Sequence, residues 1–254
     1  PTGDGESCST CYDDSFSFSS RYDTNGDISD QSNIFFIYHY PKPDDISQDQ
    51  KDYIQSVIFE FESVLLSENN EELLNLIDLQ SFIDFFIINE LSKNPDGYRL
   101  STFLNKDFNG KLKMGPIWDF NLAYANVDYC DGANPVGWIY NFNSICPDDI
   151  WQVPFWWEDL MQKEVFKTAL KNRWFSLRSS SLSNSTILNT IDSYTENLKS
   201  NKITDQNFYV WPVLGQYIWP NFFVGSTHEE EIEFLKSWID DRLDWMDMEI
   251  NSLN

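Results

Sequence analysis

The sequence has 254 residues, enough for one large domain or two small ones. Its formal net charge is −24 at pH 7, and 17% of its residues are aromatic. The charge argues against a nucleic-acid or anionic-membrane binder, because both need a basic surface, and the aromatic content argues against a disordered chain. No apolar run is long enough to span a membrane. With His39 and His228 as the only histidines, zinc sites and Ser-His-Asp triads are disfavoured.

Residues 1–32 are polar and acidic, and we expect them to form an N-terminal segment ahead of a core domain over 33–254. This segment carries a C-x-x-C pair, Cys8 and Cys11. A redox pair should lie between a strand and a helix, whereas these cysteines lie in a polar stretch without hydrophobic periodicity. Redox chemistry is therefore disfavoured, and these cysteines either form a structural disulfide or belong to a loose chain end.

The other two cysteines, Cys130 and Cys146, lie in a loop rich in Gly, Pro and Asn. We expect a disulfide between them that fastens this loop. The sequence also has an N-glycosylation sequon at Asn184. An even number of cysteines, a sequon and high acidity together indicate a secreted protein.

The first predicted elements are a short strand over 34–38 and a helix over 47–67. Ser47 and Gln50 form a capping box at the start of the helix. Apolar residues then recur at helical spacing, at Ile54, Val57, Ile58, Phe61, Val64 and Leu65.

The middle of the chain predicts a buried helix followed by a hairpin. Residues 79–91 are apolar nearly all round, which is typical of a buried helix. Residues 99–104 and 111–117 predict two short strands, and the Asn109-Gly110 pair between them is a hairpin signal.

The remaining chain predicts a long loop over about 126–152 and helices over about 154–178, 184–200 and 227–250. Acidic residues follow Thr227, a favourable charge pattern for the start of the last helix. The pattern as a whole predicts an α+β fold that is mostly α, with one small central β-hairpin.

Two carboxylates flank the predicted hairpin: Asp96 precedes it and Asp119 follows it. A hairpin can bring its two ends close together, with Arg99 and several lysines nearby. Phosphoryl transfer needs such a set, because one carboxylate orients the attacking hydroxyl, another holds Mg²⁺ and cations neutralise the phosphates. The alternative is structural, with Asp96 as a turn residue and Asp119 as a helix cap or a partner of Arg99.

The stretch that contains both carboxylates resembles the core of the CotH family, the spore-coat-type atypical protein kinases. It reads IDFFIINELSKNPDGYRLSTFLNKDFNGKLKMGPIWDFNLAYAN. Further similar blocks follow in the same order as in the family, namely VDYCDG, the Gly137-Trp138 pair, VPFWWEDL, KNRWFSLR and WPVLGQYIWPN with the helix after it. The resemblance extends from about residue 34 to 250.

The resemblance implies a fold distantly similar to protein kinases, with ATP and Mg²⁺ or Mn²⁺ as cofactors. Asp96 matches the family's catalytic aspartate, and Asp119 matches the metal-binding aspartate of its W-D motif. Asn121 stands where some members have a second acid and is a further candidate metal ligand. Arg99 and Trp118 are candidate nucleotide contacts.

The function implied is transfer of phosphate from ATP to Ser or Thr hydroxyls of a protein substrate, by a secreted protein or one on the cell or spore surface. The alternative is a non-catalytic surface, adhesion or scaffold module of the same family that binds protein or carbohydrate. Family domains usually have a further N-terminal segment with a basic residue that clamps the nucleotide. We therefore expect either that the chain is one part of a longer protein or that it does not bind ATP in the family's manner.

Overall fold

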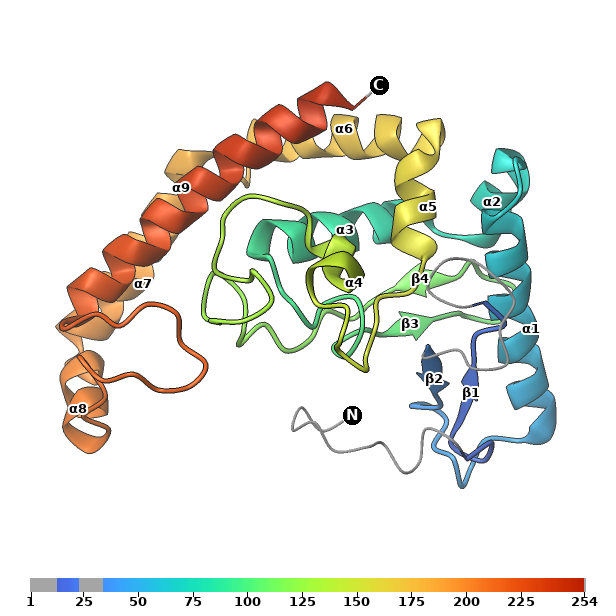
Figure 1. The fold of residues 1–254 in the computed structure, drawn as a ribbon, viewed down its shortest axis with the longest axis horizontal. Helices are drawn as coiled ribbons and strands as arrows, with labels where there is room; N and C mark the ends of the chain where they lie inside the picture. The colour runs from blue at the N-terminus through green and yellow to red at the C-terminus, as the bar shows by residue number, and fades with distance from the viewer. Residues whose placement is uncertain (1–12, 23–33, 254) are drawn as a thin grey trace. The chain divides into compact units, whose positions relative to one another are not determined.

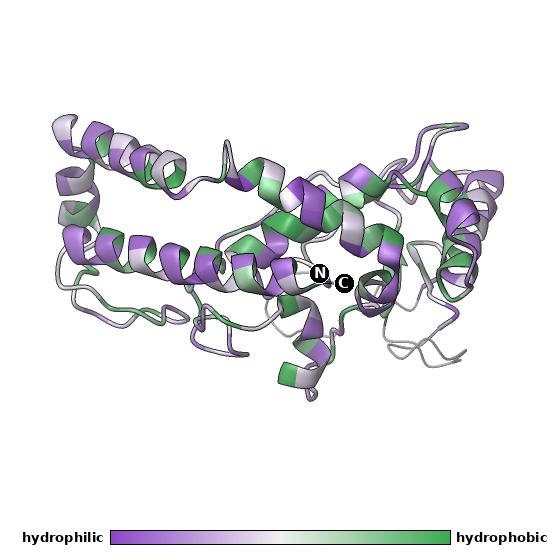
Figure 2. Cartoon of the chain, turned by 90° about the horizontal axis from the view of Figure 1, so that it is seen from above, coloured by the Kyte–Doolittle hydropathy of each residue, from purple (hydrophilic) through white to green (hydrophobic). Residues whose placement is uncertain are grey.

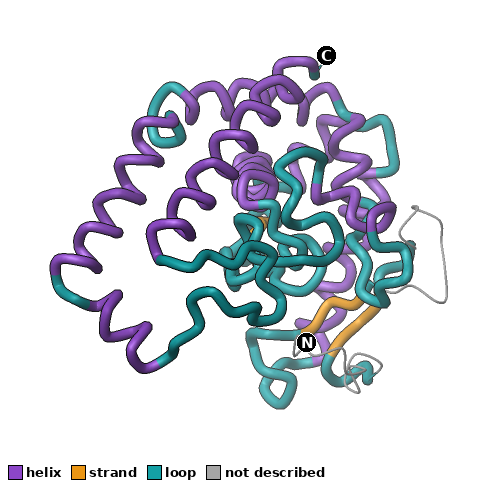
Figure 3. Tube along the Cα trace, turned by 60° about the vertical axis from the view of Figure 1, so that its left-hand side comes forward, coloured by secondary structure: helices purple, strands orange, loops and turns teal. Residues whose placement is uncertain are grey.

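The computed structural model of the chain describes residues 13–22 and 34–253 (Figure 1). Cys8, Cys11 and most of the acidic segment 1–32 lie outside the described residues. About 51% of the structure is helical, and its sheets are two small antiparallel pairs of strands (Figure 3). This confirms the predicted α+β, mostly α class. The chain divides into two compact units, each built from segments that are discontinuous in sequence.

The first unit comprises the described residues up to Phe85 together with 96–118 and 140–166. Strand β1 (Ser17–Ser19) pairs antiparallel with β2 (Phe35–Ile37). Its helical elements are α1 (Gln48–Leu65), α2 (Asn70–Leu76), the start of α3 (Leu79–Ser92), the 3₁₀ helix η1 (Ile139–Asn141, whose first residue belongs to the second unit), α4 (Phe142–Ile145) and α5 (Trp156–Gln162).

Helix α1 begins as the sequence predicts. The Ser47 hydroxyl accepts the Gln50 N–H, and the Gln50 side chain accepts the Ser47 N–H, so two backbone donors at the helix start are satisfied. The predicted strand over 34–38 and helix over 47–67 are confirmed, whereas β1 and α2 were not predicted from the sequence.

The predicted hairpin is present but much shorter than expected, because its strands are only β3 (Leu104–Asn105) and β4 (Lys113–Met114). The first predicted strand is wrong over its first residues, where the N–H groups of Arg99 to Ser101 all donate to the Asp96 carbonyl and so form a turn. The second is interrupted because the N–H of Leu112 donates to Leu76 outside the hairpin. Asn109 adopts a left-handed φ of 59° in the connecting turn.

Aromatic side chains form the core of the first unit. Trp156 stacks on Phe36 with ring centroids 5.4 Å apart and meets the edge of Phe61 at 4.9 Å. Trp157 packs against Phe85 and Tyr98 at 5.8 and 4.6 Å. Both tryptophans are 1% exposed, so the two adjacent rings of α5 are central to the packing of this unit.

The second unit comprises residues 86–95, 119–139 and 167–254. It contains the end of α3, most of α6 (Glu164–Arg178) and the helices α7 (Asn184–Ser200), α8 (Ile203–Val210) and α9 (His228–Ser252). Helices α7 and α9 lie side by side (Figure 1). The predicted helix over 154–178 is divided into α5 and α6, because Lys163 has an extended backbone conformation; α8 was not predicted.

Helix α9 carries the core of the second unit on one face. Both apolar and polar residues occur along the whole length of the helix (Figure 2). Its buried residues recur three or four positions apart, as in an amphipathic helix: Trp238, Ile239, Arg242, Leu243, Met246 and Ile250. Trp245 meets Trp138 edge-on at 4.7 Å, and Trp138 contacts Phe86 of α3 at 5.8 Å. Over the described ranges 13–22 and 34–253, no helix is long and apolar enough to cross a membrane.

Candidate functional site

Asp96 begins a tight turn of the first unit, a few residues after the end of α3. Its backbone carbonyl accepts the N–H groups of Arg99, Leu100 and Ser101 at 3.3, 3.0 and 2.9 Å. Its carboxylate accepts a hydrogen bond from Arg99 Nη2 at 2.9 Å. The turn and the ion pair together fix the position of the Asp96 carboxylate, and the structure thus brings the predicted Asp96 and Arg99 together.

Arg99 is itself held by several groups of the first unit. Its Nη1 donates to Asp149 Oδ1 at 3.0 Å and to the carbonyl of Trp151 at 3.1 Å. Its guanidinium carbon lies 4.1 Å from the centroid of the Phe142 ring, a cation–π contact. Only 4% of the side chain is exposed. These contacts are those expected of a residue that positions Asp96.

Asp119 lies at the start of a segment of the second unit, immediately after the exposed Trp118 of the first. Its φ is 60°, in the left-handed region that non-glycine residues rarely adopt. The segment is attached to the end of α3, because Asn94 Nδ2 donates to the Asp119 carbonyl at 3.4 Å and the Tyr124 N–H donates to the Ser92 carbonyl at 2.7 Å. Strained backbone of this kind is concentrated at functional sites.

The Asp119 carboxylate is exposed, and within the described residues it makes no ion pair or hydrogen bond. Asn121 is also exposed, and its carbonyl accepts from Asn126 Nδ2 at 2.7 Å. Asp119 belongs to the second unit and Asp96 to the first, so their convergence in one site stays a prediction.

A divalent cation was predicted from the resemblance. Among the residues the structure describes, no group of three or more His, Cys, Asp or Glu side chains could hold a metal ion. Mg²⁺ in phosphoryl-transfer sites, however, usually keeps several waters and takes only one or two carboxylates in addition to substrate phosphates. The open carboxylate of Asp119, with the amide of Asn121 nearby in sequence, fits that kind of site.

Sequence reasoning missed a buried cation in the second unit, Lys93. Its ammonium group donates to Asp131 Oδ2 at 3.1 Å, to the Asn134 carbonyl at 2.8 Å and to the Val136 carbonyl at 2.7 Å. The side chain is fully buried, and this burial lowers the pKa of Lys93 below its usual value. Lys93 therefore fastens the loop after Cys130 to the end of α3.

A second buried cation, Arg242 of α9, holds the next part of the same loop. It donates to the carbonyls of Pro135 and Gly137 at 2.9 and 2.7 Å and forms a fully buried ion pair with Glu90 of α3 at 3.1 Å. Glu90 also accepts the N–H of Ile139 at 2.9 Å. One sequence signal could have pointed to this pair: Glu90 lies among apolar residues near the end of a mostly apolar helix, and a buried acid needs a partner.

Cys130 and Cys146 are disulfide-bonded to each other, which confirms the predicted bridge. Asn184, the predicted glycosylation site, is the first residue of α7. Its Nδ2 donates to Asp240 Oδ1 at 2.9 Å, and its Oδ1 accepts from Arg178 at 2.7 Å. A glycan on Nδ2 would displace Asp240, and glycosylation stays a prediction.

The comparison with protein families agrees with the resemblance that the sequence motifs carry. A family model described as "CotH kinase protein" matches residues 16–246, which is most of the chain and includes every described site residue above. No curated protein and no solved structure matches the chain significantly. Because this family model matches most of the chain, the chain belongs to the CotH kinase protein family.

Proposed function

We propose that the chain acts in an atypical protein kinase that transfers the γ-phosphoryl group of ATP to Ser or Thr hydroxyls of a protein substrate. Membership of the CotH family supports a kinase-related domain. The observation that carries the proposal is the carboxylate of Asp119, which is exposed, held on strained backbone and without an ion-pair partner among the described residues.

In this proposal Asp119, with Asn121, holds Mg²⁺ or Mn²⁺ together with the phosphates of ATP. The metal, when bound, neutralises the negative charge that develops on the phosphate oxygens. Because no residue of the described chain competes for the carboxylate of Asp119, metal binding there need not break an existing ion pair. Trp118 is 61% exposed, so its ring is available as a nucleotide contact.

Asp96 is the proposed base. It orients the Ser or Thr hydroxyl and accepts its proton while the hydroxyl oxygen bonds to the γ-phosphorus and the bond from that phosphorus to the β,γ-bridging oxygen breaks, which releases ADP. Arg99 is a positioning residue in this scheme, because it fixes one carboxylate oxygen of Asp96 at 2.9 Å and is itself fixed by Asp149 and Phe142. We further propose that the protein works outside the cell or on a spore surface, an environment that its disulfide suits.

The test is calorimetric titration of the 254-residue chain with ATP in the presence of Mg²⁺ or Mn²⁺. We expect metal-dependent binding, and we expect Asp119→Ala to weaken it by about tenfold or more, because loss of even an indirect metal contact has an effect of that size. Thermal unfolding of the same variant should change only modestly: the carboxylate is exposed, but Ala tolerates the left-handed φ of residue 119 less well than Asp does.

The matched control is Asp244→Ala, which removes an exposed carboxylate from α9 and should leave ATP binding unchanged. Equal ATP affinity in the wild-type and Asp119→Ala proteins would refute the metal role. Asp96→Asn should keep metal-dependent ATP binding but lose phosphate transfer to a Ser- and Thr-containing protein. That result would distinguish the role of the base from the role of the metal ligand.

A second candidate function is a non-catalytic surface module that binds protein or carbohydrate. It is favoured by one observation, the exposed aromatic rings around the end of α8 and the loop after it. The most exposed of them are Tyr209, Trp211, Tyr217, Trp219 and Phe222. Absence of ATP binding in the titration above, from a folded chain, would favour this second function.

A further inference from the structure

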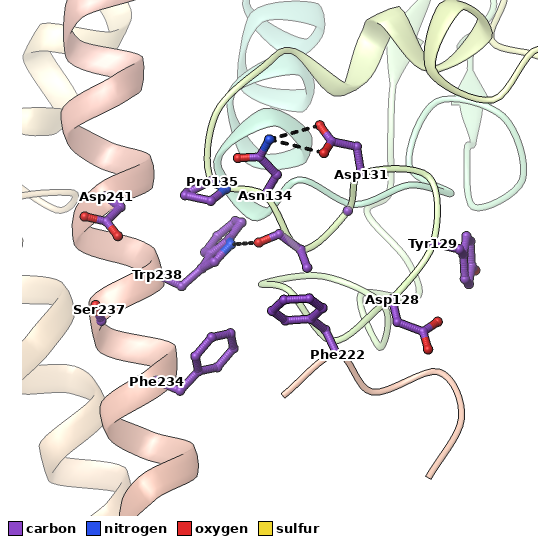
Figure 4. Close-up of a pocket in the computed structure, with 12 residues that line it drawn as sticks. Asp128, Tyr129, Asp131, Asn134, Pro135, Phe222, Phe234, Ser237, Trp238 and Asp241 are labelled. Atoms are coloured by element: carbon purple, nitrogen blue, oxygen red, sulfur yellow. Dashed lines mark hydrogen bonds between the residues drawn. The ribbon is translucent and has the colours of Figure 1, made fainter. Parts of the chain in front are cut away.

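A cavity of about 500 Å³ opens in the second unit, and the proposed kinase chemistry does not use it (Figure 4). Its walls are the loop over residues 128–135, one face of α9 and Phe222 from the segment between α8 and α9. Its lining includes neither Asp119 nor Asn121 of the same unit. The cavity is therefore separate from the residues proposed to hold the metal.

The loop wall of the cavity is fixed by donors behind it. Trp238 Nε1 donates to the Ala133 carbonyl at 2.7 Å, Lys93 donates to the carbonyls of Asn134 and Val136, and Arg242 donates to that of Pro135. All three donor side chains are almost completely buried. A wall held in this way is preorganised, so a ligand does not have to order it on binding.

The charge on the lining is of one sign. Asp128, Asp131 and Asp241 line the cavity, and the lining contains no Lys, Arg or His. Two of these carboxylates already have partners, since Tyr217 donates to Asp128 and Lys93 donates to Asp131. The cavity is therefore negative, and of its three carboxylates only Asp241 makes no ion pair or hydrogen bond with the described residues.

The other walls are aromatic. Phe234 and Trp238 project from α9, and Phe222 lies beneath the loop that carries Asp131 (Figure 4). The rings of Phe222 and Phe234 are 6.3 Å apart. Aromatic faces attract cations through their quadrupole and bind best those cations that lose little hydration, which quaternary ammonium groups do.

We propose that this cavity binds an organic cation whose charge lies on an alkylated ammonium group. A metal ion does not suit it, because its carboxylates do not form a cluster that could coordinate one, in the chain as described. A strongly hydrated primary ammonium needs direct carboxylate contacts, and two of the three carboxylates are already engaged. An alkylated ammonium needs only a negative field and an open aromatic face. Phe222, 55% exposed, offers that face, since Phe223 stacks on Phe234 at 4.3 Å and Trp238 is only 3% exposed.

Choline and 3,3-dimethyl-1-butanol provide the test, since the alcohol has the shape of choline without its charge. Calorimetric titration of the 254-residue chain should show saturable binding of choline. The alcohol should bind at least about tenfold more weakly than choline. We expect Phe222→Leu to weaken choline binding about two- to fivefold, because it keeps an apolar group and removes the ring face. Asp241→Asn should also weaken it, because it removes a negative charge from the lining.

Tyr209→Leu is the matched control, since Tyr209 is an exposed ring on α8 outside the cavity lining. It should leave choline binding unchanged. Three results would each overturn the proposal: no saturable binding of choline at millimolar concentration, equal binding of choline and the alcohol, or choline binding that neither Phe222→Leu nor Asp241→Asn alters. None of these results bears on ATP binding, so this proposal and the proposed kinase function can fail separately.

Discussion

Each of the two units contains a glutamate that is completely buried, Glu62 in the first and Glu90 in the second. Glu90 has a cationic partner, because Arg242 lies 3.1 Å from its Oε2 and the N–H of Ile139 donates to the same oxygen. The hydrogen bonds to Glu62 that define its position come from uncharged groups, the Ser20 hydroxyl at 2.6 Å and the Trp156 indole at 3.1 Å.

The difference shows two ways to bury the same side chain. In the second unit the carboxylate is part of a charge-paired network that also fixes the loop over 135–139. In the first unit burial raises the pKa of Glu62. The hydrogen bonds from Ser20, Trp156 and the Arg21 backbone, and the nearby charge of Arg21, lower it by less. Loss of Arg242 should therefore remove a charged partner from a buried carboxylate in the second unit, whereas loss of Ser20 should remove only a hydrogen bond in the first.

The largest effect should come from Arg242→Met, which keeps most of the side-chain volume and removes the charge. The buried Glu90 then loses the ion pair with Arg242, and the carbonyls of Pro135 and Gly137 lose their donor. We expect the free energy of unfolding, measured by urea titration, to fall by about 3–5 kcal/mol.

Lys236→Met is the control for this substitution, because it removes a cation from the same helix at the surface, where Lys236 pairs with Asp192 and Glu233. Solvent screens such pairs, so its cost should stay within about 1 kcal/mol. Addition of Glu90→Gln to Arg242→Met should restore part of the lost stability. A similar small cost for Arg242→Met and Lys236→Met would contradict the importance of the buried pair.

An intermediate effect is expected from Ser20→Ala in the first unit. The substitution removes one of the two side-chain hydrogen bonds to Glu62 and leaves that of Trp156 in place. We expect the free energy of unfolding to fall by about 1–3 kcal/mol, the usual cost of a buried polar group that loses a partner. Ser56→Ala is the control, because it removes a hydroxyl from the exposed face of α1. If Ser56→Ala lowered the free energy of unfolding as much as Ser20→Ala, the loss of the contact with Glu62 would not explain the effect of Ser20→Ala.

Hydrophobic periodicity was sufficient to predict the long helices α1, α3, α7 and α9. Helices α1 and α9 bury one face and α3 buries most of its circumference, whereas α7 shows the helical period although none of its residues is fully buried. It missed the seven-residue α2 and the eight-residue α8, which are too short to show a periodic pattern. It also overestimated the hairpin strands, since alternation cannot reveal that the N–H groups after Asp96 turn back to its carbonyl.

The polar interior was harder to predict from the sequence than the apolar one. Glu62 follows Ile58 by four residues and precedes Leu65 by three, so helical spacing places it on the buried face of α1, but its partners Ser20 and Trp156 are 42 and 94 residues away. The partner of Glu90 is 152 residues away in a strongly acidic helix. At the candidate site, the motifs around Asp96 and Asp119 were visible in the sequence, whereas the positioning of Arg99 by Asp149 depends on the tertiary fold.

The smallest change, Glu62→Gln, tests the comparison through its pH dependence. A carboxyl group with a raised pKa in the folded state binds more protons there than in the unfolded chain, so its contribution to stability is fully present below the ordinary pKa of 4.5 and is lost as the pH rises through the raised value. Gln resembles the protonated acid at all pH values. The stability of the variant relative to wild type should therefore increase as the pH rises above 4.5 and then level off, as measured by urea unfolding at a series of pH values. Glu60→Gln, on the exposed face of the same helix, serves as the control. Parallel pH curves for wild type and Glu62→Gln would mean that the pKa of Glu62 is not raised by folding. Glu62 would then be buried as a carboxylate, as Glu90 is beside Arg242, and the contrast between the two units would disappear.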